Sequence, residues 1–381
     1  MNARSLRWKS GAGWSVPVGD LPAAADLLLC FGSAEHLTRG DGPAAELRRR
    51  YPSALAASCS TAGEICGAAV SDDGLAALVI GFAKTRVRGL CAAVSGPADS
   101  ERAGLEIGRS LLDPELRHVL VLSDGLAING SALTSGLRAS LPGHVDATGG
   151  LAGDGARFQR TLVGLGSGIT QNQVIGIGFY GADFQVEHGS AGGWQPFGPK
   201  RLVTKAEANV LYTLDGKPAL ALYKRYLGER ANDLPGSGLL FPLQLLSGSA
   251  SETNLVRTIL AVDEERQSLT FAGDLPVGHY VRLMKANSDA LVEGARVAAE
   301  SSGKRRILGE RAAVLVSCVG RKLVLGRRVE EEVEAVLTQL GENVSAAGFY
   351  SYGEICPGGM ERGCELHNQT MTLTVFGECA G

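Results

Sequence analysis

Residues 119–125, Val-Leu-Val-Leu-Ser-Asp-Gly, are a short apolar run that ends in a polar turn, and their surroundings decide the fold. A helical stretch follows at 131–141, and a second run at 145–154 ends in glycine followed by a carboxylate. A strand, a helix and a strand within about 30 residues are typical of a βαβ unit. Because neither run alternates regularly between apolar and polar residues, we expect both strands to be buried on both faces of a parallel sheet.

The same order of elements occurs twice more along the chain. It runs through residues 27–64 and again through residues 314–354, and each second strand ends in a glycine followed by an acid. The second and third copies match further, because helical stretches at 99–112 and 288–299 precede them and an Asn-Gln pair opens their last strand. The sequence therefore predicts an internally repeated chain.

These repeats predict an α/β fold. Duplicated βαβ units would form mixed parallel and antiparallel sheets with outer helices, in two pseudo-related halves around a shared cleft. We expect one domain at residues 20–192 and a second at 193–381. Within the second domain, residues 193–277 have no counterpart in the first, and residues 278–381 form the repeated half.

The composition is that of a folded protein and limits its partners. Of 381 residues, 52 are glycine, about twice the usual share, which predicts many tight turns. The net charge of −3 gives no reason to expect nucleic-acid or membrane partners. No apolar run is long enough to span a bilayer, no signal peptide is evident, and the eight cysteines are scattered. We therefore expect a cytoplasmic protein with reduced thiols.

Three stretches resemble one protein family. Residues 59–65, Cys-Ser-Thr-Ala-Gly-Glu-Ile, resemble the signature of the FIST N-terminal domain. Residues 348–355 together with 365–370 are similar to the signature of the FIST C-terminal domain, and residues 209–220 look like the opening of that domain. The resemblance extends from about residue 25 to residue 378, which is nearly the whole chain.

The resemblance implies a sensory role. The family is regarded as one that binds small ligands and relays signals, often beside kinase, cyclase or phosphodiesterase modules. Some stand-alone members are haem proteins that sense nitric oxide and regulate a histidine kinase. Because the FIST-like region fills the chain, the resemblance implies a small-molecule ligand and a separate signalling partner, such as a histidine kinase or a cyclic-nucleotide enzyme. It leaves the ligand unnamed, with haem as one candidate cofactor.

The glycine-acid turns are the first candidate binding residues. Glu64, Asp154 and Glu354 are expected at the carboxyl ends of equivalent strands, the edge where α/β sheets bind ligands. Each acid could instead cap the turn that follows it. The neighbouring candidates for ligand binding are Cys59, Ser60, Thr61, Gly149, Gly150, Tyr350, Ser351 and Tyr352.

His367, Asn368 and Gln369 open the last strand and complete the predicted ligand site. His367 has three readings: a ligand contact, an axial haem ligand, or a buried histidine with a structural role. His188 is the second candidate for haem. No metal site is predicted, because Cys356 and Cys364 are spaced too widely for a zinc knuckle.

Two functions of other classes remain alternatives to a non-enzymatic sensor. A hydrolase or transferase would use Cys59 or the acids Glu64 and Glu354, but no base with a characteristic spacing accompanies Cys59. A structural adaptor would bind no ligand. A sensor needs two states that differ in ligand affinity, and the glycine-rich loops 149–155 and 356–363 are the candidate switch elements.

Overall fold

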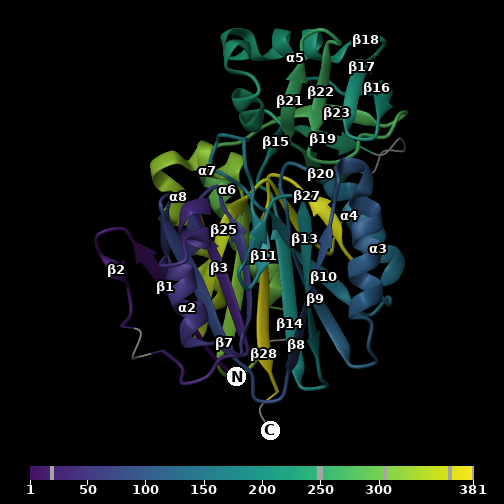
Figure 1. The fold of residues 1–381 in the computed structure, drawn as a ribbon. Helices are drawn as coiled ribbons and strands as arrows, with labels where there is room; N and C mark the ends of the chain where they lie inside the picture. Colours follow the sequence, from purple (N-terminus) through teal and green to yellow (C-terminus); the bar gives the residue numbers. More distant parts are fainter. Residues whose placement is uncertain (18–20, 247–251, 304–306, 359–362, 380–381) are drawn as a thin grey trace.

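Three similar β-sheets form the body of the protein in the computed structural model (Figure 1). The structure describes residues 1–17, 21–246, 252–303, 307–358 and 363–379. In each sheet, a central strand pairs in parallel with the strand after its helix and antiparallel with a third strand. These trios are β3 (Leu27–Gly32), β4 (Leu55–Ser60) and β7 (Gly74–Gly81); β9 (Leu116–Ser123), β10 (Asp146–Leu151) and β13 (Gln173–Tyr180); and β24 (Arg311–Cys318), β25 (Val344–Ser351) and β28 (Met371–Glu378).

A fourth strand extends each trio by antiparallel pairing with its third strand. These strands are β1 (Asn2–Lys9), which also pairs with β2 (Gly13–Trp14), β8 (Arg86–Ala93) and β14 (Phe184–Ala191). The three sequence repeats thus correspond to three sheets of the same topology. The first predicted half, residues 20–192, contains the first two trios of strands, and the second, residues 193–381, contains the third. The predicted fold class, mixed sheets built from βαβ units with outer helices, is confirmed.

Each unit donates a β-hairpin to the sheet of a neighbour. The hairpin of the first unit pairs with β25, that of the second with β4, and that of the third with β10. The hairpins are β5 (Glu64–Cys66) with β6 (Ala69–Ser71), β11 (Val163–Leu165) with β12 (Gly168–Thr170), and β26 (Gly353–Cys356) with β27 (Glu365–His367). Because the exchange closes a cycle, it holds the three units together at the ends of β4, β10 and β25.

The three sheets share one apolar core, and helices cover their outer faces. Leu29, Leu122 and Val314, on the three central strands, lie together in this core. The residues directly before and after each of them along the strand face outward, towards the helices. Helices α1 (Ala34–Thr38) and α2 (Pro43–Arg50) cover the first sheet, α3 (Ser100–Leu111) and α4 (Gly130–Ser140) the second, and α6 (Ser288–Ser302) and α8 (Val329–Leu340) the third. Helix α7 (Val319–Leu325) leads from β24 towards α8. Burial on both faces explains why these strands are almost wholly apolar.

Glycines let α3 and α4 approach closely. A Cβ atom on Gly104 would lie 2.3 Å from the carbonyl oxygen of Leu133, and one on Gly136 would lie 2.1 Å from that of Glu101. The side chain of Asn129 caps α4 by accepting two backbone N–H groups. A side chain at either glycine would push the two helices apart.

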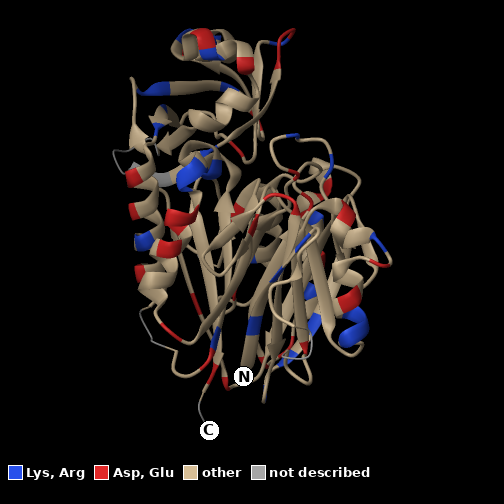
Figure 2. Ribbon diagram, turned by 90° about the vertical axis from the view of Figure 1, so that its left-hand side faces the viewer, with Lys and Arg blue, Asp and Glu red and all other residues tan. Residues whose placement is uncertain are grey.

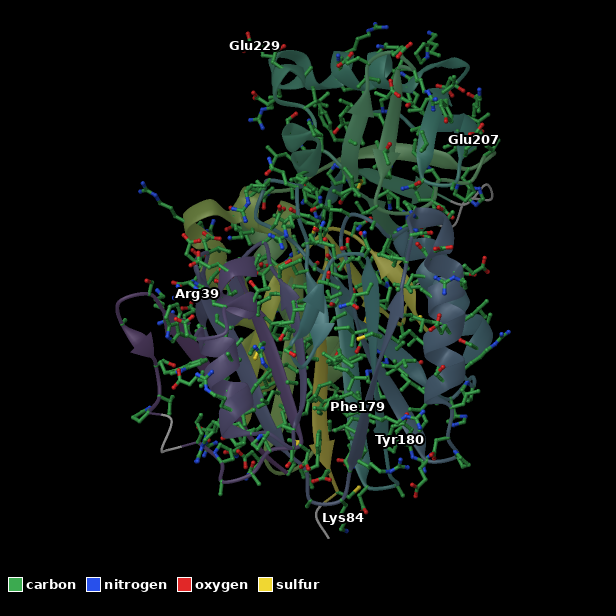
Figure 3. All side chains as sticks on the ribbon, in the orientation of Figure 1. Arg39, Lys84, Phe179, Tyr180, Glu207 and Glu229 are labelled. Atoms are coloured by element: carbon green, nitrogen blue, oxygen red, sulfur yellow. The ribbon has the colours of Figure 1, made fainter. Side chains whose placement is uncertain are left out.

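Aromatic side chains fill the shared core at the end of the body nearest the termini. Phe179 stacks on Phe184 and on Phe376, with ring centroids 4.9 Å apart in both pairs. Figure 3 shows Phe179 at this lower end, far from Glu207 and Glu229 at the opposite end of the molecule. The candidate residues described below lie between these extremes.

Residues 195–285 form a smaller unit between β14 and α6, which we call the middle unit. It has its own apolar core, which includes Leu211, Leu220 and Phe271, and Figure 1 shows it at the end of the body opposite the termini. Its elements are β15 (Gln195–Pro196), β16 (Arg201–Glu207), β17 (Val210–Leu214), β18 (Lys217–Pro218), α5 (Ala219–Leu227), β19 (Leu243–Leu246), β20 (Glu252–Arg257), β21 (Ile259–Asp263), β22 (Ser268–Phe271) and β23 (Tyr280–Lys285). The boundary predicted at 193 falls two residues before its first strand.

Charged side chains lie mainly on the outer helices and loops, and the inner strands are largely uncharged (Figure 2). No helix of the described residues combines the length and the apolarity needed to cross a bilayer. A charged side chain that is buried, such as Glu64 or Glu354, is therefore an exception in this fold.

Candidate functional site

The predicted glycine-acid turns meet at one end of the body, where backbone hydrogen bonds link β4, β10 and β25 in a ring. The bonds run from Ala62 N–H to Tyr350 O (2.8 Å), from Gly153 N–H to Ser60 O (3.0 Å) and from Tyr352 N–H to Leu151 O (3.1 Å). The fold thus brings together candidates that are almost 300 residues apart in the sequence. We call this region the strand-end ring.

Glu64 and Glu354 hold equivalent positions in the strand-end ring and have equivalent partners. One carboxylate oxygen of each accepts a hydrogen bond from a hydroxyl three residues earlier, and the other accepts a backbone N–H and a second hydroxyl. The donors are Thr61, Ser71 and Gly74 for Glu64, and Ser351 and Thr370 for Glu354. Both acids stabilise the turns that follow them.

Burial raises the pKa of both Glu64 and Glu354 to about 7, although their hydrogen bonds favour the ionised form. Each carboxyl group therefore changes charge near neutral pH. Neither residue lines any of the cavities described below. In this conformation they support the strand ends, and their predicted contact with a ligand stays a prediction.

Asp154, Tyr350 and Tyr352 also find their partners within the protein. Asp154 accepts hydrogen bonds from the backbone N–H groups of residues 158–160 and from the hydroxyl of Tyr352. The hydroxyl of Tyr350 donates to Glu332 at 2.6 Å. Both tyrosines are buried with satisfied hydroxyls, which is the core reading that the sequence left open.

Cys59 and Ser60 lack the features of catalytic nucleophiles. Burial raises the pKa of the Cys59 thiol well above its ordinary value. The hydroxyl of Ser60 donates to a backbone carbonyl and accepts a backbone N–H. Gly149 and Gly150 serve close packing, since a Cβ atom on Gly149 would lie 1.9 Å from the carbonyl oxygen of Val121.

His367 lines a cavity between the body and the middle unit, which we call the His367 cavity. Its volume is about 350 Å³, within the range of about 300–1,000 Å³ that is typical of small-molecule sites. The body contributes Trp194, Val297 and Thr370 to its wall, and the middle unit contributes Gln244, Val256 and Met284. The two units thus enclose the cavity together.

The ring of His367 presents an acceptor. Burial lowers the pKa of His367 to about 4, so the imidazole is neutral at physiological pH. Nε2 lies 3.1 Å from the carbonyl oxygen of Cys356, and because a carbonyl only accepts, Nε2 carries the proton. Nδ1 therefore carries a lone pair that can accept a hydrogen bond. It has no partner among the described residues and is not one of the fully enclosed polar atoms.

Thr370 connects the His367 cavity to the strand-end ring. It lines the cavity, and its N–H and hydroxyl donate to the same oxygen of Glu354 at 3.1 and 2.8 Å. On the other side, the indole N–H of Trp194 donates to the carbonyl oxygen of Gln369 at 3.0 Å. A displacement of Thr370 would therefore reach a buried carboxyl group directly.

Asn368 and Gln369 carry buried polar atoms without partners. Asn368 Nδ2, Gln369 Oε1 and Thr258 Oγ1 have no hydrogen-bond partner within the described residues. Thr258 belongs to the middle unit, and its N–H donates to Asn368 Oδ1 at 3.4 Å. Buried polar atoms of this kind are usually satisfied by water or a ligand, so the boundary between the units is where such a molecule is expected.

The two candidate histidines do not fit haem. His188 lies on the outer strand β14, where its Nε2 contacts Asp146 at 3.1 Å, and it lines none of the cavities described here. In His367, Nε2 is engaged with the carbonyl oxygen of Cys356, so the nitrogen that ordinarily binds haem iron is already bonded within the protein. Within the described residues, no group of three His, Cys, Asp or Glu side chains is placed to hold a metal ion.

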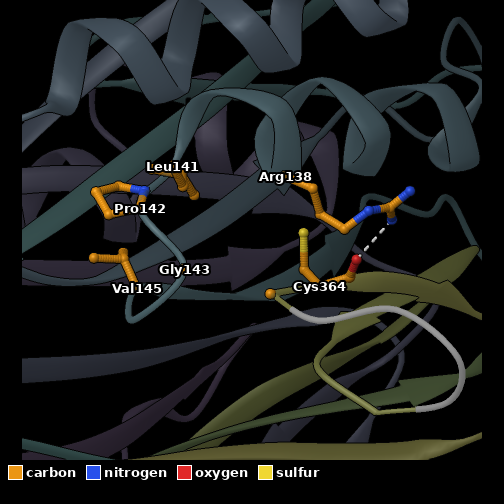
Figure 4. Close-up of a pocket in the computed structure, with 7 residues that line it drawn as sticks. Arg138, Leu141, Pro142, Gly143, Val145 and Cys364 are labelled. Atoms are coloured by element: carbon orange, nitrogen blue, oxygen red, sulfur yellow. Dashed lines mark hydrogen bonds between the residues drawn. The ribbon is translucent and has the colours of Figure 1, made fainter.

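A smaller cavity beside Cys364 has a volume of about 130 Å³ (Figure 4). Arg138, on its wall, donates to the carbonyl oxygen of Cys364 at 2.9 Å. Burial raises the pKa of the Cys364 thiol to about 12, so this thiol is not reactive. In the predicted switch loop 356–363, residues 359–362 lie outside the described part of the chain.

Sequence reasoning missed the contribution of the middle unit to the candidate site. Trp194, Gln244 and Val256 lie within residues 193–277, the segment without a counterpart, and Met284 lies in the predicted repeated half; none of them belongs to a motif that points to a ligand. One signal was available: Arg257 is the only charged residue in the run from Leu255 to Val262. A single charge in such a run marks a buried or functional position.

Comparison with known proteins confirms the resemblance seen in the sequence. The family model of the FIST N domain matches residues 26–217, and that of the FIST C domain matches residues 219–357. No curated protein matches the chain. Among solved structures, a cyanuric acid hydrolase from A. caulinodans is 10% identical, with 78% of this chain and 100% of that chain covered, but a TM-score of 0.19 supports no inference. The chain belongs to the FIST family, whose domains are associated with sensory signal transduction.

Proposed function

We propose that this protein is a sensor that binds a small molecule in the His367 cavity and reports it to a separate signalling protein. The observation that carries the proposal is the position of the cavity, whose wall is shared by two units with separate apolar cores. A ligand that contacts both units binds best in one arrangement of them and so shifts the population towards it.

The lining of the His367 cavity is part polar and part apolar, and it favours a small ligand that carries both an apolar part and a hydrogen-bond donor. Val256, Met284 and Val297 supply apolar contacts. His367 Nδ1 is an acceptor, so the matching ligand group is a hydroxyl, an amide or an ammonium group. The volume of about 350 Å³ suits a small metabolite.

Thr370 connects the proposed ligand to the body, because it lines the cavity and donates hydrogen bonds to Glu354. A ligand that moves Thr370 changes the hydrogen bonds of Glu354 and therefore the protonation of a carboxyl group with a pKa of about 7. The strand-end ring joins all three sheets, which gives this change a connection to every sheet of the body and so to a partner that contacts any of them. The proposed partner is a histidine kinase or a cyclic-nucleotide enzyme.

The proposed compartment is the cytoplasm. All eight cysteines are free thiols, as expected where thiols are kept reduced. The catalytic alternatives lose support because the Cys59 thiol is buried with a raised pKa and the carboxylates of Glu64 and Glu354 bond within the protein. We accordingly propose a sensor without enzymatic activity.

A thermal-unfolding screen of the full chain against amino acids, organic acids, nucleosides and polyamines tests the proposal. A ligand at 100 times its Kd should stabilise the protein by about 2.7 kcal/mol. His367→Gln keeps a donor for Cys356 O but removes the Nδ1 acceptor, so it should weaken binding about two- to tenfold.

Val297→Trp provides a second variant that does not disturb the core. Val297 lines the cavity but is 39% exposed, so the indole should fill the cavity without strain and abolish binding. The matched control is Leu323→Trp, at a position that is 44% exposed on α7 and lines none of the cavities described above. Binding that survives Val297→Trp, or a haem absorption band lost on replacing His188, would overturn the proposal.

A further inference from the structure

A second cavity lies on the opposite face of the strands that line the His367 cavity. Its volume is about 200 Å³, and Leu245, Arg257 and Leu366 line it. Val256 and His367, the strand neighbours of Arg257 and Leu366, line the His367 cavity. Because successive residues of a strand point to opposite faces, β20 and β27 lie between most of the two cavities, which adjoin at Leu255, a residue that lines both. We call the second one the Arg257 cavity.

Arg257 is a buried guanidinium with one nitrogen unused. The residue is 5% exposed. Its Nη1 donates to Leu366 O (3.0 Å) and to Val256 O (3.4 Å), and its Nε donates to Asp274 O (3.2 Å). Among the described residues, Nη2 has no hydrogen-bond partner and the guanidinium forms no salt bridge with a carboxylate. Nη2 is not one of the fully enclosed polar atoms, so it opens into the cavity that Arg257 lines.

This arrangement is costly unless the cavity is filled. A buried charge is normally paired, because removing it from water without a counter-charge is strongly unfavourable. The carbonyl oxygens on Nη1 and Nε fix the plane of the guanidinium and leave Nη2 as the only position for a further acceptor. Asp274 and Glu365 attract this guanidinium without forming a salt bridge to it, so an anion at Nη2 would supply the missing hydrogen bond and a direct ion pair.

We propose that the Arg257 cavity binds a small monocarboxylate, with one carboxylate oxygen on Nη2 of Arg257. The first turn of α4 adds to the attraction, because Ser131 and Thr134 line the cavity near the positive end of that helix. Asp274 and Glu365 line it as well, and their negative charges disfavour a dianion such as phosphate. This site does not depend on the ligand proposed for the His367 cavity.

Saturation-transfer NMR on the full chain with propionate as the probe tests the site. Propionate should bind, whereas propionamide, which has the same shape without the charge, and inorganic phosphate should not. Arg257→Gln should weaken propionate binding by about tenfold or more, the effect expected for a charge-assisted hydrogen bond.

A second variant should act in the opposite direction. Asp274→Asn removes a negative charge near Arg257 and keeps a side-chain oxygen that can accept from Asn129, so it should strengthen propionate binding several-fold. A purely structural Asp274 would not produce this gain. If Arg257→Gln does not fold, the change in propionate affinity of Asp274→Asn is sufficient to test the proposal.

Three results would overturn the proposal: equal binding of propionate and propionamide, stronger binding of phosphate than of propionate, or an unchanged affinity in Asp274→Asn. Val297→Trp separates the two cavities. It should leave propionate binding intact, and loss of propionate binding in this variant would assign the probe to the His367 cavity and refute the Arg257 site.

Discussion

The buried carboxyl group of Glu354 should make the stability of the protein depend on pH near neutrality. Glu354 is fully buried, and burial raises its pKa from 4.5 to about 7. Glu354→Gln removes the ionisable group and keeps its shape, so that the amide oxygen can accept from Thr370 and the amide N–H can donate to Ser351.

Whether Glu354 makes the protein more or less stable as pH rises depends on whether the folded or the unfolded chain binds its proton more tightly. The folded protein holds the Glu354 proton up to pH about 7 and the unfolded chain releases it above pH 4.5, so the stabilisation is complete at low pH and is lost as pH rises through 7. Between pH 5 and pH 8 this loss amounts to about 2–3 kcal/mol of unfolding free energy. Glu354→Gln should abolish that part of the pH dependence.

His367 acts in the opposite direction, and a difference measurement removes its effect. Its pKa is lowered to about 4, so its contribution is lost as pH falls below about 6.5, equally in the wild type and in the variant. The assay is urea unfolding of both proteins at pH 5, 6, 7 and 8, with the exposed Glu342→Gln as a control. Parallel pH profiles for wild type and Glu354→Gln would refute the reasoning.

Two further predictions concern packing and a buried ion pair. Gly104→Ala should destabilise the protein by about 1–3 kcal/mol in urea unfolding, because the new methyl group meets Leu133 O at 2.3 Å, whereas Gly40→Ala, with nothing within 4 Å, should have little effect. Arg321→Met should lower the free energy of unfolding by about 3–5 kcal/mol, because it leaves the carboxylate of Glu332 buried without its counter-charge. In the wild type, Arg321 pairs with Glu332 at 2.8 Å, and both side chains are wholly buried. Adding Glu332→Gln to Arg321→Met should recover part of that loss, and no recovery would show that the charge is not the cause.

Local sequence patterns were sufficient to predict the repeated units. Runs such as 119–123 and 314–318 contain too few polar residues for a half-exposed strand, so burial on both faces follows from composition alone. Local signals also account for helix α5 (Ala219–Leu227), which begins directly after Pro218, and for the hairpin of β21 and β22, which turns after Asp263.

The exchange of hairpins and the candidate cavities could not be predicted in this way. Glu64 pairs with Phe349 across nearly 300 residues, and no local pattern determines which sheet a short hairpin joins. His367 was singled out from its neighbours in the sequence, but its cavity exists only because the middle unit packs over it. For the same reason the sequence did not point to Arg257, because the hydrogen bonds that use its Nε and Nη1 and leave Nη2 over are formed only in the folded protein.

The central claim is that a ligand binds between the body and the middle unit. Hydrogen–deuterium exchange of the full chain, with and without the strongest compound from the thermal screen, tests it most directly. The account predicts slower exchange on both sides of the His367 cavity, in residues 190–194 and 365–370 of the body and in β19 and β23 of the middle unit. Slower exchange confined to the strand-end ring, at residues 60–64 and 350–354, would contradict it.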